Sequence, residues 1–520
     1  MSKLTTTIEP HDTSNAPARY ETDVEGFTSE KTQYKEPTKE NGSSGRSSEG
    51  EGPPQDPNIV DFDGPDDPEN PLNWPEARKA RSIVIVSLIA LLSPIGSTIS
   101  ASAAASIMQH FKITDKTLGA FVTTIYLIGF AFGPFVIAPL SELYGRAIMF
   151  RSCAVLFLIF NLACAVSNSF ASLIVYRLLT GIAGSCPGTL GASSIGDMIM
   201  REKRGSAMSI YIMGPVIGPT IGPIIGGYLT PAAGWRWDFW LMTISSGVVT
   251  VFVFLFIHES YPYVILKKKT ARLRKETGNQ NLRSALDTGK TPKKLFAFAI
   301  LRPFKMLISP IVFLLSAYSA VVYSYAYLCF TTFPRVFKVQ YGFGSGPSGL
   351  ASMGLGVGFV VGIFFIGAVS DPWSAYLTKK NGGRPKPEYR LPTLIAGAVF
   401  VPIGLFWYGW SAESKTHWIV PIIGTGFLGI GIVTAYSTTT TYLVDAYTVY
   451  SASVMAANTI LRCLTGGLLP LAGNDMFDAL GVGWGNSVLG FISLGFLPLP
   501  LLFYFYGERI RESRRFKMDF

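Results

Sequence analysis

The sequence predicts an all-α membrane protein with twelve transmembrane helices arranged as two six-helix halves. The first observation is composition: the 520 residues are 48% hydrophobic and only 15% charged, with a mean hydropathy of +0.33. A soluble protein carries about a quarter charged residues. The second is that apolar runs long enough to cross a bilayer recur twelve times. The third is that one basic segment divides these runs into six and six.

The predicted crossings have uncertain ends because several contain Gly, Pro or Ser. In chain order they cover about residues 82–106, 117–139, 148–168, 171–196, 206–229, 237–258, 308–333, 347–370, 391–410, 417–441, 451–473 and 485–506.

Charge sets the predicted domains and orientation. Residues 1–75 hold 6 Lys or Arg and 16 Asp or Glu, in a polar composition that buries too little apolar surface to fold. Segment 259–307 holds twelve cations and three acids. Because cations mark cytoplasmic connections, both termini are expected in the cytoplasm. The domains are a disordered acidic cytoplasmic tail (1–80), an N-terminal half (81–258), a basic cytoplasmic central loop (259–307), a C-terminal half (308–506) and a basic cytoplasmic tail (507–520).

The fifth run contains the most informative motif, GPVIGPTIGPIIGG at 214–227. A four-residue spacing keeps glycines on one slowly drifting face of a helix, where another backbone can approach closely. Prolines remove main-chain hydrogen bonds, which a membrane helix tolerates better than a soluble one. We therefore expect a bent, closely packed helix built on Gly214, Pro215, Gly218, Pro219, Gly222, Pro223, Gly226 and Gly227.

The two halves repeat a charged pattern after their second runs. PLSELYGR places Glu142, Gly145 and Arg146 at a cytoplasmic helix end, and Asp371 follows the second run of the other half. A carboxylate beside arginines between helix ends can hold two halves closed, so these residues are a candidate cytoplasmic gate. Helix capping and the ordinary excess of cytoplasmic cations are the alternative explanation.

Two charged residues lie well inside the runs, Arg177 and Arg462. Buried charge is costly in a membrane and is by default a functional hypothesis. The alternative for each is a structural arginine bonded to carbonyls of a broken helix. Carboxylates occur only at the ends of runs, so no proton-binding acid can be placed and strongly cationic substrates are disfavoured.

The seventh run supplies a candidate substrate surface. Tyr323, Tyr327 and Phe330 recur at helical spacing and share one face. Tyrosines form an amphipathic wall suited to varied organic ligands, and together with Arg462 they are the predicted substrate cavity. A lipid-facing aromatic belt is the alternative.

These features resemble the major facilitator superfamily. The motif at 214–227 resembles its antiporter motif, PLSELYGR its loop between the second and third helices, and RLLTGIAGS (177–185) its fourth-helix motif. DPENPLNW (67–74), GWRWDFW (234–240), the segment 259–279 and YLVDAY (442–447) are similar to the fungal drug:proton antiporter branch. The resemblance implies alternating access and a role for Arg177 in proton coupling.

The resemblance implies proton-coupled efflux of drug-like or secondary-metabolite molecules across the plasma membrane. A carrier for small organic acids on the same fold is the alternative, favoured by the two arginines in the runs. An enzyme is not expected, because no nucleophile elbow or phosphate loop occurs. The five cysteines lack metal-ligand spacing, so neither a metal nor another cofactor is expected. The expected partners are a small-molecule substrate, the proton and the bilayer, with no nucleic acid, and the chain is expected to act as a monomer.

Overall fold

The computed structural model describes residues 58–64, 66–200, 203–287, 300–382, 386–447 and 450–512. Residues 1–57 of the predicted acidic tail, 288–299 of the basic loop and 513–520 of the C-terminal tail therefore lie outside the described residues.

Eleven segments of the described residues are long and apolar enough to cross a membrane. The last of them, Ser453–Arg511, is 59 residues long and covers both of the final two predicted crossings. One crossing needs about 20 residues. Within this segment Gly481 departs from helical geometry, with φ 76° and ψ 171°. The chain is thus an all-helical, multi-pass membrane protein.

The N-terminal half, as used below, is the set of helices before the basic loop. These are α1 (Glu76–Thr98), α2 (Ser100–His110), α3 (Lys116–Tyr144), α4 (Arg146–Ala165), α5 (Phe170–Gly184), α6 (Cys186–Met198), α7 (Arg204–Ala233) and α8 (Arg236–Phe256).

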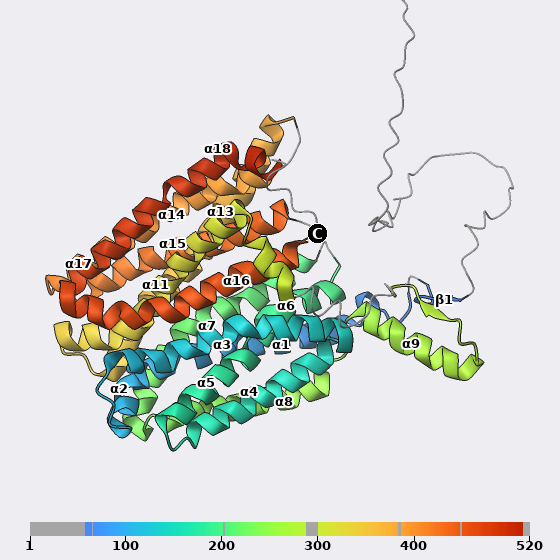
Figure 1. Ribbon diagram of the computed structural model, residues 1–520, viewed down its shortest axis with the longest axis horizontal. Coiled ribbons are helices and arrows are strands. Elements are labelled where there is room, and N and C mark those ends of the chain that lie inside the picture. Colours follow the sequence, from blue (N-terminus) through green and yellow to red (C-terminus); the bar gives the residue numbers. More distant parts are fainter. Residues whose placement is uncertain are drawn as a thin grey trace, which may run out of the picture. The chain divides into compact units, whose positions relative to one another are not determined.

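The C-terminal half is the corresponding set after the loop. It consists of α11 (Pro310–Tyr341), α12 (Ser345–Leu350), α13 (Met353–Lys380), the 3-10 helix η2 (Pro387–Arg390), α14 (Leu391–Glu413), α15 (Ile419–Ala446), α16 (Ser451–Leu468), the 3-10 helix η4 (Leu469–Ala472), α17 (Gly473–Phe496) and α18 (Pro498–Glu512). In Figure 1 the blue-to-green helices of one half lie beside the yellow-to-red helices of the other.

The two ends of the helical bundle differ in composition. Here the basic end is the end where α1 begins and where α3 and α13 finish, with Arg146 and Arg390 close by. The opposite end is where α3 begins and α11 finishes.

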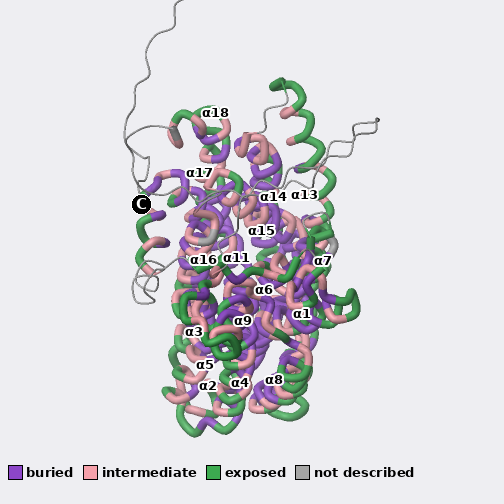
Figure 2. The backbone as a smooth tube through the Cα atoms, turned by 90° about the vertical axis from the view of Figure 1, so that its right-hand side faces the viewer, coloured by how far each residue is buried: buried purple, intermediate pink, exposed green. Residues whose placement is uncertain are grey.

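Outward faces carry exposed apolar residues, such as Val251, Phe254 and Leu255 on α8, as expected of surfaces that contact lipid. Figure 2 shows buried residues concentrated where helices face one another.

The glycine motif brings α7 against α1 along its length. A side-chain carbon at Gly214, Gly218, Gly222 or Gly226 would lie within 3.0 Å of the backbone of α1 or of its C-cap Ile99. The helix continues unbroken through Pro215, Pro219, Pro223 and Pro231. Pro223 cannot donate to the carbonyl of Pro219, and the hydroxyl of Thr98 donates to that oxygen instead at 2.9 Å. Close approach and replacement hydrogen bonds thus make the proline-rich helix stable.

Several of the predicted crossings contain more than one helix, among them the first and the fourth. α1 ends at Thr98 and α2 starts at Ser100, while α5 ends at Gly184 and α6 starts at Cys186. The last turn of any helix leaves carbonyls without partners within the helix. The break after Thr98 therefore exposes main-chain acceptors inside the bundle, and these acceptors position the candidate site.

Part of the predicted disordered tail is ordered. Residues Ile59–Val60 form β1, which pairs in parallel with β2 (Arg283–Ser284), and Pro71–Asn73 form the 3-10 helix η1. This segment packs against α9 (Pro262–Thr277) of the basic loop. Its acidity is compensated there, because the buried Lys269 contacts Asp63 at 2.8 Å and Asp67 at 3.3 Å.

The Asp67 and Lys269 pair holds both groups charged. Burial raises the pKa of Asp67, but hydrogen bonds from the backbone N–H groups of Asp63 and Glu69 and from Lys269 outweigh it and leave the pKa below its usual value. Burial lowers the pKa of Lys269, but the two carboxylates outweigh it and the pKa is raised. Composition alone predicted disorder here because the compensating cations lie about 200 residues further along the chain.

Candidate functional site

Arg177 lies fully buried on α5, where its donors meet the break in the first crossing. Its guanidinium donates to the carbonyls of Gly96 at 2.6 Å and Ser97 at 3.0 Å, and to the hydroxyl of Ser100 at 3.0 Å. Its Nε donates to the carbonyl of Val122 on α3 at 3.0 Å. The guanidinium therefore caps the exposed end of α1 and links α5 to α1, α2 and α3.

The surroundings of Arg177 are aromatic. Its guanidinium carbon lies 5.1 Å from the ring centre of Tyr126 and 5.7 Å from that of Phe239. In the conformation described here, the contacts of Arg177 match the structural alternative: an arginine bonded to carbonyls of a broken helix. Its predicted role in proton coupling stays a prediction.

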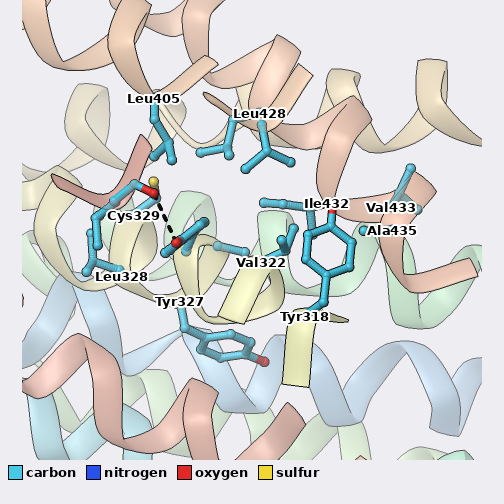
Figure 3. Close-up of a cluster of buried hydrophobic side chains, with 14 of the residues drawn as sticks. Tyr318, Val322, Tyr327, Leu328, Cys329, Leu405, Leu428, Ile432, Val433 and Ala435 are labelled. Carbon is cyan, nitrogen blue, oxygen red and sulfur yellow. Dashed lines mark hydrogen bonds between the residues drawn. The ribbon is translucent and has the colours of Figure 1, made fainter. Parts of the chain in front are cut away.

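A hydrogen bond between hydroxyls joins the two halves near the middle of α11. The hydroxyls of Ser97 and Tyr327 lie 3.0 Å apart. Figure 3 shows the Tyr327 ring on the side of α11 away from Leu405 and Leu428. The carbonyl of Ser97 also accepts from Arg177. Ser97 therefore links the buried arginine of one half to Tyr327 on α11 of the other.

The predicted aromatic face of α11 differs along its length. Tyr323 and Tyr327 have ring centres 5.4 Å apart, and Tyr327 meets Phe330 edge-on at 5.9 Å. Tyr327 and Phe330 are buried in the core of the C-terminal half. Tyr323 is partly exposed, although its neighbours at 322 and 324–330 are buried. The ring of Tyr323 is thus the member of the set that can contact a ligand without rearrangement of the core.

Arg462 on α16 lies beside Tyr323. Its guanidinium carbon is 4.3 Å from the ring centre of Tyr323 and 4.9 Å from that of Tyr436 on α15. The residue is only 9% exposed, and its Nε has no hydrogen-bond partner among the described residues. The structure therefore brings together three of the four predicted cavity residues, Tyr323, Tyr327 and Arg462, and adds Tyr436, which no sequence spacing had singled out.

At the basic end of the N-terminal half, Arg146 forms an ion pair with Asp197 at 3.6 Å and donates to the hydroxyl of Ser141 at 2.7 Å. Glu142 is exposed and lies within reach of the charges of Arg146 and Arg302. Gly145 has φ 104°, and a side chain there would collide with the carboxylate of Glu259. A glycine is required at that position.

The C-terminal half repeats this arrangement. Arg390 contacts Asp371 at 2.8 Å and Asp445 at 3.1 Å. An arginine at the start of one crossing thus pairs with an acid at the end of the next in both halves. The sequence comparison matched Glu142 with Asp371 and missed the equivalence of Asp197 and Asp445. These pairs lie within a half, so the candidate gate residues do not bridge the halves in this conformation.

The ion pair between the halves lies at the opposite end. Lys116 of α3 contacts Asp478 of α17 at 2.7 Å, and Arg335 of α11 pairs with the same carboxylate. At the same end α7 packs closely against α12. Gly227 of α7 approaches the backbone of Ser345, and Gly349 of α12 approaches the backbone of Pro223, so a side chain at either glycine would collide with that backbone. The halves are thus held together at this end.

Two carboxylates that sequence reasoning treated only as helix-end groups have defined roles in the structure. Glu259 accepts from the backbone N–H groups of Arg146 at 2.9 Å and Ala147 at 3.2 Å, so it caps α4. Asp238 is fully buried, and one of its oxygens accepts from the hydroxyl of Thr230 at 2.8 Å while the other has no partner in the part of the chain that the structure describes. Nothing in the local sequence distinguishes a buried acid at a helix end from an exposed one.

Comparison with known proteins agrees with the fold described above. A family model described as Major Facilitator Superfamily matches residues 86–470. The MFS-type transporter penM of Penicillium rubens is 55% identical over 467 residues, covering 90% of this chain and 92% of that protein. The efflux pump radE of Floropilus chiversii is 42% identical over 466 residues, covering 89% and 87%.

Among solved structures, the xylose transporter XylE of E. coli in a partially occluded inward open conformation has a TM-score of 0.58. It is 16% identical, and the match covers 83% of this chain and 98% of that one, a likeness in fold. Fold and relatives define a multi-pass membrane transporter and not an enzyme. The chain belongs to the major facilitator superfamily.

Proposed function

We propose that this chain is a secondary active transporter that exports drug-like or secondary-metabolite molecules by alternating access, driven by protons. The observation that carries the proposal is the polar and aromatic site shared by the two halves. Ser97 of one half bonds to Tyr327 of the other, and Arg462 and Tyr323 lie next to that contact. A site between two halves can open to either side as they rock.

The distribution of contacts supports the rocking motion. The ion pair of Lys116 with Asp478 holds the halves together at the opposite end, whereas Arg146 and Arg390 at the basic end pair within their own halves. Closing the basic end requires new partners for these groups. Glu142, Gly145, Arg146 and Asp371 are therefore proposed as the gate that forms in the other state. The relative radE is named an efflux pump, which supports export as the direction of transport.

Asp238 is the proposed proton-binding group. Its carboxyl is fully buried with one oxygen unpartnered, and a buried carboxylate gains by taking up a proton. The next residue, Phe239, contacts Arg177. Arg177 is the proposed coupling residue, because its fixed charge disfavours a protonated carboxyl that moves toward it.

The remaining features of the proposal concern placement. Residues 453–511 are long enough for two crossings, which makes twelve in total with both termini in the cytoplasm. Reporter tags after residues 60 and 515 should then both be cytoplasmic, and a tag at 475–478 external. The proposed location is the plasma membrane and the proposed functional unit a monomer. An external C-terminal tag would overturn the twelve-helix topology.

The test of function is flux in vesicles that contain the purified full-length chain, with and without an imposed proton gradient. Export of a neutral lipophilic dye should accelerate with the gradient, and Asp238→Asn should remove that acceleration while leaving dye binding intact. A small-organic-acid carrier is the second candidate, because Arg177 and Arg462 have no carboxylate partner among the described contacts. It predicts gradient-driven flux of succinate and none of the dye.

A further inference from the structure

Arg462 is a buried guanidinium whose surroundings are incomplete. Within the described residues its guanidinium contacts the rings of Tyr323 and Tyr436 and makes no hydrogen bond or ion pair. We propose that Arg462, between these two tyrosines, binds the anionic group of an aromatic or conjugated substrate: a carboxylate, enolate or phenolate. This inference rests on the proposed transport function and specifies the substrate class of that same site.

Hydrogen bonding carries the first step. A guanidinium has five N–H donors and no acceptor, and burying it without acceptors is costly. Arg462 is 9% exposed and its Nε has no partner in the part of the chain that the structure describes. An acceptor that is not part of the protein would remove that cost. A carboxylate does so best, because it can accept two parallel hydrogen bonds from the planar fork.

Aromatic contacts carry the second step. Tyr323 and Tyr436 flank the guanidinium carbon at 4.3 Å and 4.9 Å and are both partly exposed. Cation–π attraction holds the guanidinium between the rings. The same rings offer apolar faces to a ligand ring that lies beside its bound anionic group. A small aliphatic acid would use the arginine and leave the rings unused.

A second unpartnered side chain lies on the same face of α16. Asn458 is one helical turn before Arg462, is fully buried, and neither its amide nitrogen nor its amide oxygen has a partner in the described residues. An amide adds both a donor and an acceptor, which suits a substrate that carries a hydroxyl or carbonyl next to its anionic group. Two unsatisfied polar groups one turn apart indicate a surface built for a ligand.

The test is binding of two probes of the same ring size to the full-length protein in nanodiscs, measured by titration calorimetry. The probes are 1-naphthoate, which is anionic, and 1-naphthamide, which is neutral. Wild type should prefer the anion by about tenfold, the value of one charged hydrogen-bonded pair. Arg462→Gln should lose this preference and keep naphthamide binding. Arg462→Lys should restore part of it, because lysine keeps the charge without the fork.

Arg81→Gln is the matched control, since it removes a cation from an exposed position of α1 and should leave the preference unchanged. The inference is overturned if wild type binds naphthoate no better than naphthamide, or if Arg462→Gln weakens both probes equally. It is also overturned if succinate binds as well as naphthoate.

Transport is read separately in vesicles. Anion preference without gradient-driven flux of any probe supports the Arg462 site and contradicts the proposed export function. Gradient-driven flux with no effect of Arg462→Gln on probe preference supports export and contradicts the site. A melting curve of each variant shows whether a loss of binding follows a loss of folded protein, and the Arg462→Lys result then decides.

Discussion

Arg177 and Arg462 are two buried arginines in similar surroundings, but they differ in their hydrogen bonds. Both lie inside membrane-spanning segments, both are more than nine-tenths buried, and both contact tyrosine rings. Arg177 donates to two carbonyls that the helix break after Thr98 exposes, to the carbonyl of Val122 on α3 and to the hydroxyl of Ser100. Arg462 has no such break beside it, and it makes no hydrogen bond to another described residue. Whether the protein itself satisfies the donors of a buried arginine therefore depends on the backbone around it.

The largest effect should come from Gly222→Leu, which separates α7 from the segment of α1 that offers its carbonyls to Arg177. A side chain at Gly222 collides with Thr98 and the backbone of Ile95. Overpacking costs about 1–3 kcal/mol or more, and displacing backbone costs the most. Flux should be abolished and the melting temperature lowered. Gly495→Leu is the control, because that position has open space around it. Full flux in the Gly222 variant would refute the close-packing interpretation.

The next effect is Arg177→Ala. It leaves buried carbonyls of Gly96, Ser97 and Val122 without their donor, at about 1–3 kcal/mol for each such group. Thermal unfolding in detergent should show a large loss of stability, and vesicle flux should vanish. Arg177→Lys should recover little of the stability or the flux, because a single ammonium group cannot reach all the acceptors that the planar guanidinium binds. A stable Arg177→Ala protein that lacks flux would assign the residue to coupling instead of structure.

Arg462→Ala should lower the stability of the protein less than Arg177→Ala does. Arg462 donates no hydrogen bond to another described residue, so its removal leaves no acceptor without a donor. The free energy of unfolding should fall by about 2 kcal/mol, the size of cation–π contacts at a desolvated site. Flux of anionic aromatic compounds should fall about tenfold while neutral ones are unaffected. Equal destabilisation by the two alanine variants would break the comparison.

The smallest effect concerns the ion pair between the halves. Asp478→Asn weakens the contacts with Lys116 and Arg335, which are partly exposed and worth about 1 kcal/mol or less. The opposite end should open more often, by a factor of about two to five. A cysteine in place of the buried Ser348 of α12 reports this opening through its rate of labelling by an impermeant maleimide. Asp475→Asn, at an exposed position nearby, serves as control; equal rates in both would exclude a latch role.

Much of the fold follows from the order of residues along the chain. Apolar runs and basic connections marked the crossings because a bilayer demands length and apolarity from each segment by itself. The glycine spacing likewise predicted which face of α7 meets another backbone. The last two crossings were separated in the sequence at 474–484, the region where Gly481 leaves helical geometry.

The residues of the candidate site could be predicted from the sequence, but the contacts between them could not. Tyr323, Tyr327 and Arg462 stood out as types and spacings, yet nothing along the chain placed Tyr436 on the other side of Arg462. The burial of Asp238 and the capping of α4 by Glu259 were equally hidden. Residues 59–64 and 66–69, expected to be disordered, lie against α9, whose Lys269 is remote in sequence, and residues 76–80 of the same predicted tail are the first turns of α1.

The sequence by itself determined the membrane-spanning class, the division at the basic loop and the two arginines that require explanation, because these depend on composition and local period. Only the tertiary structure decided what each arginine does. Hydrogen-bond satisfaction depends on which backbone groups of other helices come within about 3 Å. The carbonyls of Gly96 and Ser97 reach Arg177 because α1 ends there, while the guanidinium of Arg462 on α16 lies over the faces of two tyrosine rings instead of near backbone carbonyls.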